Sequence, residues 1–212
     1  VYKRQEFVTF QGNEEFDRKK GKGYGEALIL EYALEHSLFV HQCDFLVKIT
    51  GRLKLLNVNS MIGFHRYILP HCDIQSEMDR RERYSDSRML ITDKGFLQHS
   101  FLARKERIDD SKGCNFEHIL FTSIDEQKDF VFYPFLIRPL WRGISGTNGR
   151  EYWEGNYTSL KLAYFKRMLN CMTEYNMCHP HNKPSMGVRL VLGMAGMAVG
   201  TVLRFFDWIK NE

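Results

Sequence analysis

Residues 20–57 read KGKGYGEALILEYALEHSLFVHQCDFLVKITGRLKLLN and form one α/β unit. A glycine-rich basic turn opens the stretch, and apolar residues then recur with helical spacing from Ala27 to Leu38. The apolar run Phe45–Val47 predicts a short buried strand, which ends in the polar turn Lys48–Arg52. Open α/β sheets place their ligand sites at the carboxyl ends of strands. The unit therefore favours an enzyme with an anionic ligand over an inert module.

Glycines and lysines surround the expected start of this helix: Gly21, Gly23, Gly25, Lys19, Lys20 and Lys22. Glycines let a backbone approach a ligand closely, and the N–H groups of a helix N-terminus attract anions. Glu26 falls in the expected first turn, where a carboxylate favours the helix dipole. No Gly-Lys-Ser/Thr of the Walker pattern follows. A phosphate cradle and a solvated basic turn with a C-cap glycine are therefore equally consistent with these residues.

Several motifs along the chain together carry a family resemblance. They are Glu6–Phe10, Gly21–Ala27, the helix end His36-Ser37, Lys48–Arg52 and Asn57, with weaker matches at Asp86-Ser87-Arg88, Glu117-His118 and Gly143–Gly146. In these motifs the chain resembles a family of bacterial glycosyltransferases associated with capsule, O-antigen and related surface polysaccharides. The similarity covers most of residues 6–150, and its first block is the most specific part.

The resemblance implies a GT-A-like fold, which is a Rossmann-related mixed sheet flanked by helices, with a nucleotide-sugar donor and a glycan or lipid-linked acceptor. It implies a donor site made from Lys22, Gly23, Gly25, Glu26, Lys48, Thr50, Gly51, Arg52, Asp86 and Arg88. It also implies a sugar or acceptor site at Ser145 and Gly146. A GT-A domain needs an earlier βαβ portion to hold the nucleotide base. We therefore expect residues 1–150 to be a core that is incomplete at its N-terminus, followed by a helical segment over residues 151–212.

The expected metal motif is missing. Many GT-A enzymes carry Asp-x-Asp after the corresponding strand, whereas this chain has Lys48–Arg52 there and no Asp-x-Asp anywhere. Fixed cations can offset developing diphosphate charge, so Lys48 and Arg52 predict transfer without a metal. Use of Mn²⁺ or Mg²⁺ remains the alternative, because loops can supply scattered carboxylates such as Asp109 and Asp110.

Glu117 and His118 are the candidate catalytic pair, since an inverting sugar transfer needs a carboxylate or an imidazole as base for the acceptor hydroxyl. Asn115 is placed to cap a helix through both residues. Adjacent helical positions diverge by about 100°, so we expect one of the two to act. The structural alternative is a surface glutamate beside a partly buried histidine. For Arg88 the corresponding alternative is an arginine paired at the surface. The charged residues 73–88 are expected to form a surface loop.

The C-terminal part differs in character. Residues 190–203 are an apolar run of 14 residues between two arginines, which is shorter than the roughly 20 residues of a spanning helix. Residues 185–210 therefore predict either an interfacial helix on the inner face of the cytoplasmic membrane or a buried helix. The spacing of Cys171, Cys178, His179 and His181 fits no common zinc motif, so a simple loop is the preferred interpretation.

Composition bounds the remaining alternatives. The chain has 212 residues, 43% hydrophobic content and a net charge of +4, all ordinary for a globular domain. This mild charge permits an anionic substrate, and with no RNA-binding signature no nucleic-acid partner is expected. Five scattered cysteines indicate no disulfide framework and favour the cytoplasm. Two other functions stay open: a non-catalytic binding module for phosphorylated or nucleic-acid ligands, and an inactive transferase fragment.

Overall fold

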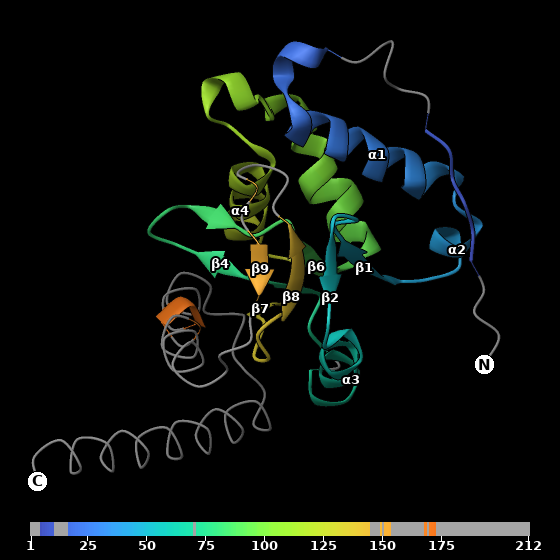
Figure 1. The fold of residues 1–212 in the computed structure, drawn as a ribbon, viewed down its shortest axis with the longest axis vertical. Coiled ribbons are helices and arrows are strands. Elements are labelled where there is room, and N and C mark those ends of the chain that lie inside the picture. The colour runs from blue at the N-terminus through green and yellow to red at the C-terminus, as the bar shows by residue number, and fades with distance from the viewer. Residues whose placement is uncertain are drawn as a thin grey trace, which may run out of the picture.

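A four-stranded mixed sheet lies at the centre of the fold (Figure 1). The computed structural model describes residues 5–10, 17–69, 71–144, 149, 151–153, 168 and 170–172. The strands follow the order β1 (Phe45–Ile49), β6 (Met89–Asp93), β3 (Ile74–Ser76) and β7 (Phe132–Pro134). β6 is antiparallel to β1 and to β3, whereas β3 is parallel to β7. The predicted α/β class is confirmed, and β1 includes the expected strand at 45–47. The expectation that this strand is buried was wrong, because β1 lies at the edge of the sheet and Phe45 and Val47 are exposed.

Helices cover one face of this sheet (Figure 1). They are α1 (Lys22–His36), α4 (Phe116–Glu126), the π-helical segment η2 (Phe96–Phe101) and the 3₁₀ segment η3 (Leu102–Arg107). Their buried side chains form the main core together with Leu90 of β6. Three short segments extend this layer: η1 (Arg18–Lys20), α2 (Leu38–His41) and η4 (Asp110–Lys112).

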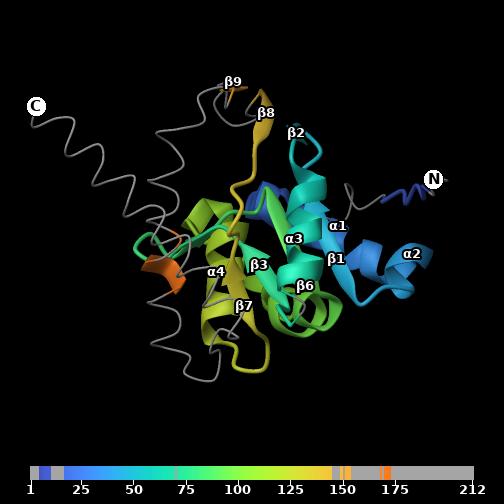
Figure 2. The ribbon, with the colours of Figure 1, turned by 90° about the horizontal axis from the view of Figure 1, so that it is seen from below.

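The other face of the sheet packs against α3 (Val58–Ile68) and a small second sheet. That sheet has the order β2 (Leu53–Leu55), β8 (Trp141–Ile144), β9 (Glu151–Trp153), and it lies at one end of the central sheet (Figure 2). Because side chains alternate along a strand, Met89 and Ile91 of β6 face this second core while Leu90 faces the first. The central strand β6 is thus buried on both sides, whereas the edge strand β1 leaves Phe45, Val47 and Ile49 exposed.

Two local expectations differ from the structure. The helix α1 begins at Lys22, so Gly23 and Gly25 lie inside the helix and Glu26 follows its first turn. The segment 73–88 is not simply a loop. It contains the buried strand β3 and a hairpin of β4 (Met78–Asp79) and β5 (Tyr84–Ser85), with four consecutive charged residues, 80–83, at the hairpin tip.

The segment at residues 5–10 is anchored through Glu6. Its carboxylate accepts hydrogen bonds from Ser37 Oγ at 2.7 Å and from the backbone N–H of Leu38 at 2.9 Å, at the start of α2. These bonds, with the Ser37 bond as the largest cause, lower the pKa of Glu6. Glu6 therefore ties the first motif of the resemblance to the end of α1.

Other expectations fall on parts of the chain that the structure does not describe. These are Ser145 and Gly146, residues 185–210, and the set Cys178, His179 and His181. Among the described residues, no helix has the length and apolarity needed to cross a membrane.

His65 predicts a pH-dependent stability. It is half-buried on α3, and its Nδ1–H donates to Gln75 Oε1 at 3.0 Å. Burial is the main cause that lowers the pKa of His65 from its ordinary value of 6.5. The unfolded chain therefore binds more protons just below pH 6.5, and the folded state loses stability as the pH falls through that window. We expect His65→Gln to remove this part of the pH dependence in urea unfolding between pH 7 and pH 5. The exposed His99 gives a control, because His99→Gln should leave the profile of the wild type unchanged. An identical profile for His65→Gln and the wild type would contradict the prediction.

Candidate functional site

Polar side chains from distant segments meet at the edge of the sheet where β1, β3 and β7 end and β6 begins. Glu26 comes from α1, Lys48 from β1, Ser87 from the turn before β6, and Glu117 from the first turn of α4. We call these four residues the edge cluster. This is the edge at which open α/β sheets bind their ligands.

Lys48 is the centre of the edge cluster. It lies directly opposite Leu90 in the β1–β6 pair, so its side chain faces the helical layer. Its Nζ forms an ion pair with Glu26 and donates a hydrogen bond to the backbone carbonyl of Ser87. It also lies 5.3 Å from the centre of the Phe116 ring. The Lys48 side chain is only 10% exposed, so its ammonium group bonds to Glu26 and Ser87 within the protein and not to solvent.

Ser87 connects Lys48 to Glu117, the candidate base, within the edge cluster. Its hydroxyl donates to Glu117 Oε1 at 2.6 Å, and the residue is 8% exposed. The predicted cap is confirmed, because Asn115 Oδ1 accepts the backbone N–H of His118 at 3.0 Å and so starts α4 at Phe116. Glu117 is therefore in the first helical turn, where the helix dipole favours its negative charge.

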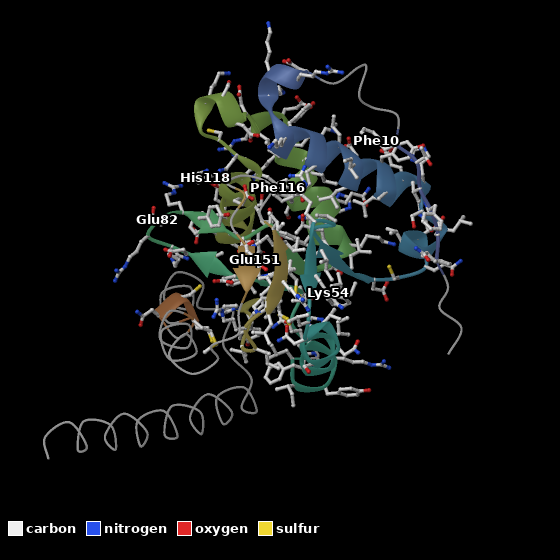
Figure 3. All side chains as sticks on the ribbon, in the orientation of Figure 1. Phe10, Lys54, Glu82, Phe116, His118 and Glu151 are labelled. Atoms are coloured by element: carbon white, nitrogen blue, oxygen red, sulfur yellow. The ribbon has the colours of Figure 1, made fainter. Side chains whose placement is uncertain are left out.

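His118 points elsewhere. Its ring lies edge-on to Tyr84, with 6.2 Å between the centroids, and its buried Nδ1 has no hydrogen-bond partner among the described residues. Figure 3 shows Phe116 and His118 pointing to different sides of α4. Glu117 instead accepts a hydrogen bond from Ser87, so the divergence expected for the neighbouring positions 117 and 118 is present, and only Glu117 joins the edge cluster.

Asp86 and Arg88 pair with each other. The Asp86 carboxylate accepts the Arg88 backbone N–H at 2.8 Å and Arg88 Nε at 2.8 Å, and it also binds Nη2. The Arg88 guanidinium lies 5.5 Å from the Trp141 ring of β8. The Arg88 carbonyl accepts the backbone N–H of Thr50 at 2.9 Å, which ties the end of β1 to the start of β6. Arg88 is thus paired with the Asp86 carboxylate, as the structural alternative for this arginine predicts.

The expected phosphate cradle at the start of α1 contains a carboxylate. The Gly23 backbone N–H donates to Asp110 Oδ2 at 3.1 Å. A Cβ on Gly23 would lie 2.9 Å from Asp110 Oδ1 and 3.0 Å from the Phe116 backbone nitrogen. Close packing of α1 against η4 and α4 therefore accounts for this glycine. The side chain of Lys22 is exposed outside this contact.

The remaining predicted residues lie around the edge cluster. Gly51 and Arg52 are exposed in the turn between β1 and β2, and Thr50 is half-buried beside them. Gly25 lies within α1. The site combines three carboxylates, from Glu26, Asp86 and Glu117, with the cations of Lys48 and Arg88. Across the described part of the chain, no group of three or more His, Cys, Asp and Glu residues could hold a metal ion.

The sequence did not identify Ser87 as a candidate site residue. In the sequence it is only the neighbour of Asp86 and Arg88, and its partner Glu117 lies 30 residues away. The one available signal was its place in a motif of the resemblance. In comparisons with known proteins, no family model, no curated protein and no solved structure matches this chain.

Proposed function

We propose that the chain is a glycosyltransferase, or the larger part of one, that moves a sugar from a nucleotide-sugar donor to a glycan or lipid-linked acceptor in bacterial surface polysaccharide synthesis. The observation that carries the proposal is the Ser87–Glu117 hydrogen bond, which holds a carboxylate at the ligand-binding edge of an α/β sheet. It is supported by the grouping of the resemblance motifs, because Glu26, Lys48 and Glu117 come from three of them.

In this proposal Glu117 is the general base. Its carboxylate takes the proton of the acceptor hydroxyl while that oxygen forms a bond to the anomeric carbon of the sugar. The bond from the anomeric carbon to the phosphate oxygen of the donor breaks at the same time, and the nucleotide leaves with the electron pair. Arg52, exposed beside the end of β1, would meet the negative charge of the leaving group.

The finer fold assignment belongs to the same proposal. A mixed sheet flanked by helices supports a GT-A-like arrangement, in which the donor lies over the ends of β1 and β3. Nucleotide-sugar donors and lipid-linked acceptors would place the enzyme in the cytoplasm, on the inner face of the membrane. Residues 185–210 are the proposed membrane contact.

Donor binding tests the proposal. We expect one class among UDP-, GDP-, CMP- and TDP-sugars to raise the melting temperature, measured with and without Mn²⁺. The assay is run on this chain and on the chain extended upstream from its gene, because the resemblance predicts a preceding βαβ portion. A shift in melting temperature that needs Mn²⁺ would contradict the prediction of transfer without a metal. The absence of a shift with every donor in both proteins would overturn the proposed function.

A further inference from the structure

We infer that Ser87 is a positioning residue that determines which oxygen of Glu117 meets the acceptor. The inference rests on the proposed function, in which Glu117 is the base. The Ser87 hydroxyl donates its hydrogen to Glu117 Oε1 at 2.6 Å, so one carboxylate oxygen is engaged. The other, Oε2, is the atom that would receive the proton of the acceptor hydroxyl.

The backbone on both sides of Ser87 is held from different elements. The backbone N–H of Asp86 donates to the Glu77 carbonyl at 2.8 Å, and the Arg88 carbonyl accepts from Thr50 at 2.9 Å. Between them, the Ser87 carbonyl accepts from Lys48 Nζ. These contacts come from the end of β1 and the start of the β4–β5 hairpin. They hold the backbone at Ser87 independently of the bond between its hydroxyl and Glu117.

This rigid support matters because of the side chain that it holds. Glutamate is among the side chains with the most rotamer freedom, and that freedom must be lost before its oxygen can take a proton from a bound hydroxyl. Ser87 is 8% exposed, so water competes weakly for the bond to Glu117. A hydrogen bond to an ionised carboxylate is also stronger than one between neutral groups.

Ser85 provides a matched comparison two residues earlier in the chain. It is also buried, and its hydroxyl lies 2.6 Å from the hydroxyl of Ser76. That bond joins two neutral groups on β5 and β3 and does not involve the edge cluster. Loss of the Ser85 hydroxyl thus removes a buried hydrogen bond of similar length without releasing Glu117.

Steady-state kinetics with the donor identified above tests the inference. We expect Ser87→Ala to lower kcat about ten-fold with the KM values for donor and acceptor unchanged, because binding remains while the base loses its orientation. Ser87→Thr keeps the hydroxyl and should restore most of kcat. Ser85→Ala should leave kcat close to that of the wild type. An unchanged kcat in Ser87→Ala, or an equal loss in Ser85→Ala, would overturn the inference.

A second measurement needs no substrate. Carboxyl groups are labelled with a carbodiimide and an amine, and mass spectrometry compares Glu117 with the exposed Glu126 at the other end of α4. We expect Glu117 in Ser87→Ala to react at least three-fold faster than in the wild type, and Glu117 in Ser85→Ala to react at the wild-type rate. Unchanged labelling in Ser87→Ala would show that Ser87 does not hold Glu117. If the wild type transfers no sugar but the labelling changes, the proposed function fails while the contact stands.

Discussion

Replacement of Glu117 by glutamine is expected to lower the kcat of sugar transfer by about 10²–10⁴-fold, the range for loss of a general base. Glutamine has the size of glutamate, and its amide oxygen can still accept the Ser87 hydrogen bond, so the start of α4 should be retained. It cannot take a proton from the acceptor hydroxyl. The measurement is steady-state transfer from the donor identified by thermal shift, with donor binding measured in parallel. Donor affinity is expected to stay within a few-fold of the wild type.

Two controls make this result specific. Glu126→Gln makes the same chemical change at the far end of α4, where the carboxylate lies 3.4 Å from Arg104 Nη2, and transfer should be unaffected. His118→Gln removes the other candidate base, and it should keep most of the activity because His118 faces Tyr84. Loss of transfer in His118→Gln but not in Glu117→Gln would show that His118, and not Glu117, is the general base. Salt-sensitive RNA affinity with no transfer would favour the binding-module alternative.

The sequence predicted the local elements better than their contacts. The strand at 45–47 and the Asn115 cap depend on neighbours in the chain, and both are present. The start of α1 was predicted too late, because Gly23 is favoured in the helix by contact with Asp110, 87 residues away. The buried strand β3 was missed because the charged hairpin tip dominates the composition of residues 73–88.

The same distinction applies to the edge cluster. The resemblance selected Glu26, Lys48 and Glu117, and the structure brings them together around Ser87. From the sequence, Lys48 is expected to be a free cation that binds a diphosphate. Only the antiparallel register with β6 turns its side chain toward α1, where Glu26 neutralises it. Pairing between strands 40 residues apart is a long-range property that local patterns do not contain.

The Glu26–Lys48 ion pair predicts the second large effect. Glu26→Met is expected to lower the free energy of unfolding by about 2 kcal/mol, because the Lys48 ammonium, 10% exposed, would lose its counter-ion. The effect is below the 3–5 kcal/mol typical of fully buried pairs, since Glu26 is 37% exposed and water can partly replace it. Urea unfolding at neutral pH measures the change, and the slope with urea should match that of the wild type.

The double variant Glu26→Met/Lys48→Met provides the decisive control. With both charges removed, no uncompensated ammonium remains, so this protein should be more stable than Glu26→Met alone. If the losses in free energy of unfolding from the two single changes add up in the double variant, the predicted coupling between Glu26 and Lys48 would be contradicted. The single variant Lys48→Met, which the additivity test also requires, separates the two interpretations of Lys48. If Lys48 binds the diphosphate, Lys48→Met weakens donor binding. If Lys48 instead holds the Ser87 carbonyl, Lys48→Met lowers kcat and leaves donor affinity unchanged, as Ser87→Ala does. The burial of its ammonium between Glu26 and Ser87 favours the second result.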